Sequence, residues 1–122
     1  MPLVLIGLFV FLASIFNSIM DALENEPNYD ESIFKHLDKK AWLKSESWRY
    51  CKTILGYHID PWHLAKSLMV FCIIGAIIAA IWAGAIGGIK LSLIYVSGAV
   101  FVLGAIWDLT FTLFYHGIFK VK

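Results

Sequence analysis

Hydrophobic and polar positions divide the chain into three long apolar runs and one charged stretch. The runs cover about Leu3–Met20, Ser67–Ile89 and Leu91–Phe119, and most charged residues lie between Asp21 and Lys66. A helix of about 20 apolar residues, rising 1.5 Å per residue, crosses a hydrocarbon core about 30 Å thick. The pattern therefore predicts an all-α, polytopic membrane protein with three transmembrane helices.

Composition supports this class. The 122 residues are 60% hydrophobic and 16% charged, with a mean hydropathy of +0.75, which is more apolar surface than a soluble core of this size buries. We expect one membrane domain over 1–122, with spans at about 3–20, 61–87 and 91–119 and a loop over 21–60. The loop charges are mixed in sign, which argues against binding to nucleic acid.

The second span has a defined start. Asp60 precedes Pro61, and this pair is typical of a helix N-terminus, because the carboxylate accepts free backbone N–H groups and proline has none to lose. A helix from Pro61 to about Gly87 is about 40 Å long, so its first turns project into the headgroup zone or the helix tilts.

The loop carries amphipathic patterns of its own. Apolar residues recur at helical spacing over 32–43 and again over 47–55, where Gly56 follows, and polar residues occupy the other faces. We expect one or two interfacial helices here. Five aromatic residues suit the interface as simple anchors, namely Trp42, Trp48, Tyr50, Tyr57 and Trp62.

Basic residues predict the orientation. Nine lie in the loop, at the start of the second span or in the C-terminal tail, and only Lys90 lies on the opposite side; the nine are Lys35, Lys39, Lys40, Lys44, Arg49, Lys52, Lys66, Lys120 and Lys122. The positive-inside rule places the loop and C-terminus in the cytoplasm and the N-terminus outside, and we expect a bacterial inner membrane protein. The first run lacks a basic start and an A-x-A-like site, which favours a retained anchor over a cleaved signal peptide.

Small residues mark the second span as a packing surface. They form two ladders at four-residue intervals, Gly75, Ala79, Ala83 and Gly87 in one and Ala76, Ala80, Gly84 and Gly88 in the other. Small residues at this spacing let another helix approach closely in lipid. The short connection to the third span favours a hairpin with it, while the same face of a second copy is the alternative, so we expect a homo-oligomer or a subunit of a membrane complex.

Polar residues inside the apolar runs are the candidates for function. An acidic residue such as Asp108 near a helix centre costs about 2.5–3.5 kcal/mol on insertion scales and needs compensation. The predicted topology brings the ends of the first and third spans and the start of the second to one leaflet. We therefore expect Asn17, Asp21, His63, Asp108 and His116 to converge there.

A metal or catalytic site is one of three roles that fit such a cluster. Asp21, His63, Asp108 and His116 offer oxygen and nitrogen ligands for a divalent transition metal, and Asp21, His63 and Asp108 are catalytic candidates. A hydrogen-bond network that holds the helices together and an ion or proton path are the alternatives. Asn17, Trp48, Arg49, Lys52 and Lys66 are candidates for contact with a substrate or lipid headgroup.

Four short motifs carry a resemblance. Asn17-Ser18-Ile19-Met20-Asp21, Ser32-Ile33-Phe34, Ser47-Trp48 and the run Asp60-Pro61-Trp62-His63-Leu64-Ala65-Lys66 resemble a family of small uncharacterised bacterial integral membrane proteins. The resemblance covers about the first two-thirds of the chain and implies no activity.

Three classes of function follow from these residues. The first is a membrane protein with a polar, metal-containing or metal-free site at the cytoplasmic leaflet that binds or acts on a lipid-like substrate. The second is an accessory or structural subunit of a larger membrane complex, and the third is a small oligomeric channel or transporter. No nucleophile-and-base motif or phosphate-binding glycine loop selects an enzyme class.

Overall fold

The protein is built almost entirely from helices, and three of them are long. The computed structural model describes residues 2–45, 53–54, 57–58, 60–87 and 93–121. The elements in chain order are α1 (Pro2–Glu24), α2 (Glu26–Glu31), the 3-10 helix η1 (Ile33–His36), α3 (Lys39–Trp42), the strands β1 (Thr53–Ile54) and β2 (Tyr57–His58), α5 (Pro61–Gly87), α6 (Leu93–Thr112) and the π-helix η2 (Leu113–Ile118). The two strands pair antiparallel, with Thr53 opposite His58.

Among the residues that the structure describes, three helices are long and apolar enough to cross a membrane, which is compatible with a membrane protein. The candidate spans are Leu3–Glu24, Pro61–Gly84 and Ala99–Ile118. Helices suit this setting because hydrocarbon offers no hydrogen bonds, so each backbone group must be satisfied within its own segment. α5 begins at Pro61, the position that the Asp60-Pro61 pattern predicts.

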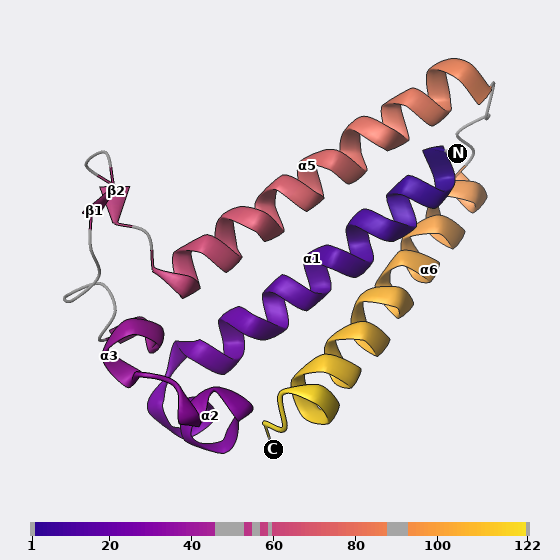
Figure 1. Ribbon diagram of the computed structural model, residues 1–122. Coiled ribbons are helices and arrows are strands. Elements are labelled where there is room, and N and C mark those ends of the chain that lie inside the picture. The colour runs from indigo at the N-terminus through magenta and orange to yellow at the C-terminus, as the bar shows by residue number, and fades with distance from the viewer. Residues whose placement is uncertain (1, 46–52, 55–56, 59, 88–92, 122) are drawn as a thin grey trace.

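α1 lies between the other two long helices (Figure 1). It packs along α5, to which it runs antiparallel, and it also contacts α6, to which it runs parallel. The predicted close hairpin between the second and third spans is wrong for the part of the chain that the structure describes, because α1 takes the place beside α5. Ser14 fastens α1 to α6 at mid-length, where its Oγ donates a hydrogen bond to the Trp107 carbonyl at 2.8 Å.

One small-residue ladder of α5 supplies the contact with α1. Ala79 and Ala83 are buried, and a Cβ added at Gly75 would lie 2.9 Å from Cζ of Phe9 in α1. The second ladder is more open, since Ala80 is exposed and a Cβ at Gly84 would meet no atom within 4 Å. The close approach that small residues permit is thus used within one chain.

The segment after α1, residues 25–45, which we name the connector, does not form the single helix predicted over 32–43. It contains α2, η1 and α3, and the residues Ser32 and Asp38 cap the starts of η1 and α3. The Ser32 side chain accepts a hydrogen bond from the Phe34 N–H at 3.2 Å, and the Asp38 side chain accepts one from the Lys40 N–H at 3.1 Å. Such side chains favour new helix starts over continuation.

The other predicted loop helix falls mostly outside the described residues. Within its predicted range, 47–55, the structure describes only Thr53 and Ile54, and these form β1 rather than a helix. The interfacial helices of the loop are therefore not established.

The ends of α1 and α6 and the start of α5 meet at one end of the molecule, beside the connector (Figure 1). Their apolar side chains form two adjoining clusters, one of Met20, Leu23, Tyr29, Leu43, Trp62 and Ala65, the other of Ala22, Phe119 and Val121. The Ile33 N–H donates a hydrogen bond to the Phe119 carbonyl at 2.9 Å, which links the segment after η2 to the connector. We name this end of the molecule the connector end.

Candidate functional site at the start of α5

A buried carboxylate and an exposed imidazole form a pair at the first turn of α5. Asp60 is 1% exposed, and its Oδ1 accepts a hydrogen bond from the His63 N–H at 2.9 Å. Its Oδ2 lies 2.5 Å from Nδ1 of the same histidine. The Asp60 side chain therefore caps the helix and orients the ring of the residue at the third helical position.

The second ring nitrogen of His63 is left for another ligand. The His63 side chain is 51% exposed, and its Nε2 makes no hydrogen bond among the described residues. When Nδ1 donates to a carboxylate, Nε2 of a neutral imidazole is an acceptor, and a protonated ring offers a donor there. Carboxylate partners of this kind are also common behind histidines that bind ligands.

Two lysines surround the indole next to this pair. Trp62 is buried in the connector-end cluster, and its ring meets the His63 ring edge to face, with centroids 4.9 Å apart. Lys44 Nζ lies 4.0 Å from the Trp62 ring centroid, and Lys66 Nζ lies 5.2 Å from it. Lys44 also reaches Glu24, with Nζ 3.4 Å from Oε1.

The charges around Trp62 are of both signs, since Glu24 pairs with Lys44 and the buried Asp60 carboxylate lies in the same helix turn. Lys66 is exposed and has no ion pair within the described ranges, and the α5 N-terminus adds the positive end of a helix dipole. Buried Trp62 Nε1 also has no hydrogen-bond partner in the part of the chain that the structure describes. The first two turns of α5 thus present one exposed basic residue, Lys66, and a fixed imidazole over the buried Asp60 carboxylate.

The predicted metal cluster is not assembled. His63 pairs with Asp60, His116 Nδ1 lies 2.7 Å from the Val121 carbonyl oxygen, and Asp108 is exposed on α6. Asp21 is half-buried near the end of α1, and Asn17 is half-buried one turn earlier. Over the described ranges, no group of three or more His, Cys, Asp or Glu side chains could hold a metal ion. Separate local partners for the two histidines are the physical reason.

Part of the predicted headgroup set falls outside the described residues, namely Trp48, Arg49 and Lys52. Lys66 lies in the first two turns of α5 described above. The sequence pattern did not identify Lys44 as a member, nor Asp60 as more than a helix cap.

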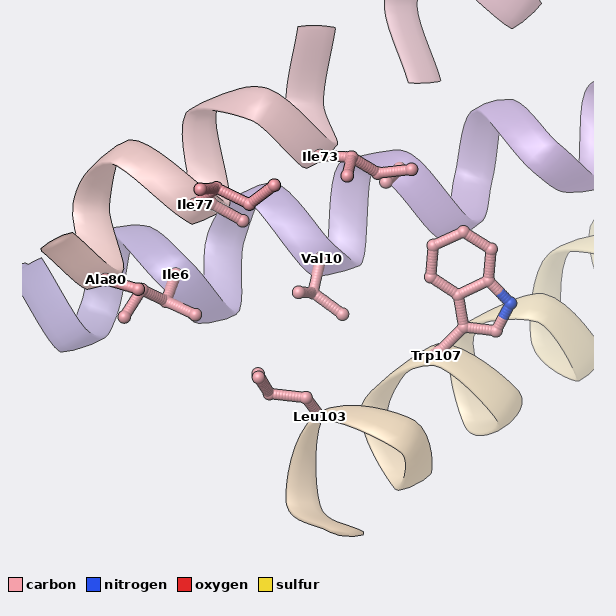
Figure 2. Close-up of a pocket in the computed structure, with 9 residues that line it drawn as sticks. Ile6, Val10, Ile73, Ile77, Ala80, Leu103 and Trp107 are labelled. Carbon is pink, nitrogen blue, oxygen red and sulfur yellow. The ribbon is translucent and has the colours of Figure 1, made fainter. Parts of the chain in front are cut away.

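A separate cavity between the spans has a different character (Figure 2). Its volume is about 230 Å³, and α1, α5 and α6 line it with apolar side chains that include Val10, Ile77, Leu103 and Trp107. It lies between the three candidate spans, and its apolar lining suits hydrocarbon rather than a polar ligand. The start of α5, by contrast, brings together a buried carboxylate, an imidazole and two lysines.

Comparison with known proteins adds no relative to this picture. No protein-family model, no curated protein and no solved structure matches the chain. The family resemblance of the short motifs thus stays a prediction, and the function has to be argued from the site itself.

Proposed function

We propose that the protein binds the anionic headgroup of a lipid-like substrate at the first turn of α5. The observation that carries the proposal is the buried Asp60 carboxylate that fixes the exposed His63 ring. A ring held in this way keeps one nitrogen in a constant direction, where it can hydrogen-bond to a ligand or exchange a proton with it.

Charge supports an anionic ligand. Lys66 and His63 lie on the first two turns of α5, and Lys44 approaches Trp62 from the connector. The helix dipole favours negative charge near the start of α5, where the Asp60 carboxylate already accepts the His63 N–H, so a phosphate would be held by the exposed side chains. Lysine contributes a strongly hydrated point charge that suits an exposed phosphate.

Position supports a lipid source for that phosphate. The candidate span in α5 begins at Pro61, so His63 and Lys66 lie in its first two turns, close to one end of the span. Phosphates of membrane lipids occupy this level. The connector fits the same level, because Ile33 and Leu37 each expose 40% of their surface beside the basic Lys35. We infer that the connector rests on the membrane surface.

We further propose that the site faces the cytoplasm of a bacterial cell. The nine-to-one distribution of basic residues supports this orientation of the three spans, with the connector and C-terminus inside. The cytoplasmic leaflet is rich in anionic lipids, which matches the charge of the site.

A titration with soluble short-chain lipids tests the proposal. Purified protein in detergent is titrated calorimetrically with short-chain phosphatidic acid and, separately, with short-chain phosphatidylcholine. Wild type should bind the phosphatidic acid more tightly, and Lys66→Gln should weaken that binding about threefold to tenfold, which corresponds to one exposed charge-assisted contact.

Lys35→Gln is the matched control, because it removes the same charge from the connector, whereas the lysines described over the Trp62 ring are Lys44 and Lys66. Its affinity should stay at the wild-type value. Equal weakening by the two substitutions would show a diffuse charge effect and no site at α5.

A further inference from the structure

The cavity between α1, α5 and α6 is elongated along the helices. On α1 its lining residues run from Ala13 to Ile6, and on α5 they run from Ile73 to Ala80, which is about 10 Å along each helix at 1.5 Å per residue. Figure 2 shows side chains of all three helices around this one space. The volume of about 230 Å³ admits a segment of hydrocarbon, since apolar cavities of about 150 Å³ bind benzene.

The cavity is open beside α5. Ile73 and Ile77 both line it, yet they expose 39% and 55% of their surface. An apolar cavity does not hold water, because water finds no hydrogen-bond partners there. Since the cavity lies between the three candidate spans, its open side faces the acyl chains of the bilayer, and a chain can enter from that side.

The face of α5 that lines the cavity continues to Lys66. Lys66 precedes the lining residue Ile73 by seven positions, or about two turns, which places both on one face of the helix. Val70, between them on that face, is exposed at 42%. An exposed strip of α5 thus leads from the proposed headgroup site to the cavity.

A polar side chain lies between these two places on α1. Asn17 follows the lining residue Ala13 by one turn on the same face, is half-buried, and makes no hydrogen bond with its side chain among the described residues. Phe9 lies against Gly75 of the antiparallel α5, so Asn17, eight positions later, lies close to the level of Lys66. An amide within a span needs a hydrogen-bond partner, because hydrocarbon supplies none.

We propose that the cavity holds one acyl chain of the lipid whose headgroup binds at the start of α5. From the connector end inward, the chain offers a cation at Lys66, an amide at Asn17 and then the apolar cavity. A glycerophospholipid presents its phosphate, ester carbonyl and hydrocarbon in the same order. The Asn17 amide donates to the ester carbonyl oxygen, which satisfies both groups. This inference rests on the proposed headgroup site and adds that its ligand is a long-chain acyl ester.

The distances fit a chain of ordinary length. Along α1 the near and far edges of the cavity, at Ala13 and Ile6, lie about 6 Å and 16 Å from Asn17 at 1.5 Å per residue. An extended chain advances about 1.2 Å per bond, as a polypeptide backbone does. A chain whose carbonyl lies at Asn17 therefore has about its fifth to fourteenth carbons in the cavity. A six-carbon chain ends at the near edge, so the short-chain titration probes the headgroup site alone.

Quenching of Trp107 by brominated lipids tests the proposal. The full chain in phosphatidylcholine nanodiscs receives a small fraction of phosphatidic acid or, separately, of phosphatidylcholine, each brominated at the ninth and tenth carbons of one chain. Trp107 lines the cavity, and the difference between wild type and Trp107→Phe gives its emission. Brominated phosphatidic acid should quench this emission about threefold more than brominated phosphatidylcholine at the same fraction, following the headgroup preference.

Two valine variants separate the cavity from the lipid around the protein. Val10→Phe places a larger side chain in the cavity and should lower quenching by the phosphatidic acid to the level of the phosphatidylcholine. Val4→Phe is the matched control, because Val4 lies on the same helix, is 67% exposed and does not line the cavity, so wild-type quenching should remain. Both variants should bind short-chain phosphatidic acid with wild-type affinity.

The two experiments distinguish failure of the cavity from failure of the headgroup site. Equal quenching by the two brominated lipids, with selective binding of short-chain phosphatidic acid, would overturn the acyl-chain site alone. Equal quenching without that selectivity would overturn the headgroup site as well. Undiminished quenching in Val10→Phe would place the chain outside the cavity and would also contradict the proposal.

Discussion

At the residue scale, Asp60 holds the candidate site together because one buried carboxylate serves two purposes. Burial of a charged group is costly unless hydrogen bonds replace the lost water, and here the His63 N–H and the His63 ring satisfy one oxygen each. The helix-capping role was predictable from the Asp60-Pro61 pair. The pairing with the ring was not, because it depends on how the His63 side chain turns at the helix start.

Separate substitutions at Asp60 should distinguish capping from ring orientation. Asn caps helices as well as Asp does, whereas Ala does not, so Asp60→Ala should lower the free energy of unfolding by about 0.5–2 kcal/mol more than Asp60→Asn. Both variants should lose the preference for phosphatidic acid. Thermal unfolding and the calorimetric titration measure the two effects; equal destabilisation by both variants would show that the His63 contact, not capping, dominates stability.

Tyr29 gives the connector a dependence on pH. Burial of the phenol raises the pKa of Tyr29, and its O–H donates to the Leu37 carbonyl at 2.8 Å. Because the folded pKa lies above the unfolded value of about 10, the folded state retains this proton more strongly. The resulting stability is complete below pH 10 and is lost as the pH rises through the folded pKa.

Tyr29→Phe tests this dependence. The variant should be less stable than wild type at pH 8 by about 1 kcal/mol, the net value of one hydrogen bond. The difference should shrink as the pH rises from 9 to 11, since only the wild type loses the phenol proton at this position. Melting curves of both proteins over this range measure the difference, and a constant gap would contradict the pKa argument.

At the element scale, the predicted helices match the structure where one local physical factor determines where a helix lies. The length of the apolar runs and the Asp60-Pro61 start are local, and they place α1, α5 and α6. The connector was mispredicted because apolar periodicity over 32–43 competes with capping by Ser32 and Asp38, and capping breaks the helix. The partner of α5 was not predictable either, since its two small-residue ladders lie side by side on the helix.

Glycine substitutions on α5 should differ according to the ladder. Gly75→Leu places a large side chain against Phe9, which a Cβ alone would approach to 2.9 Å, so we expect a loss of about 1–3 kcal/mol. Gly84→Leu faces open space and should be tolerated. The melting temperatures of the two variants are compared in one detergent. A larger decrease for Gly84→Leu than for Gly75→Leu would show that α1 packs against the Gly84 ladder instead.

At the scale of the whole molecule, the three helix ends meet as the topology predicts, but their polar residues do not converge on one centre. The predicted cluster required Asp108 and His116 to turn inward. Instead, His116 bonds to the Val121 carbonyl and Asp108 faces outward. Helix phase in a bundle depends on packing against neighbours, as shown by Ser14 and Trp107, and a single sequence does not reveal that choice.

Labelling of single cysteines tests the proposed orientation. In a background without Cys51 and Cys72, Lys35→Cys should react with a membrane-impermeant maleimide only after the cells are opened. Lys90→Cys should react in cells whose outer membrane has been removed and whose inner membrane is intact, because the nine-to-one bias in basic residues places Lys90 outside. The reverse labelling would move the α5 site to the outer leaflet.

The most direct test of the central claim is nitrogen NMR of the His63 ring in lipid nanodiscs. Protein labelled with ¹⁵N at its four histidines is compared in phosphatidylcholine and after addition of phosphatidic acid, and the His63 signals are assigned from their loss in His63→Gln. The account predicts a shift at His63 Nε2 while the His36 signals stay in place. An unchanged His63 ring, or equal shifts at all four histidines, would contradict headgroup binding at the start of α5.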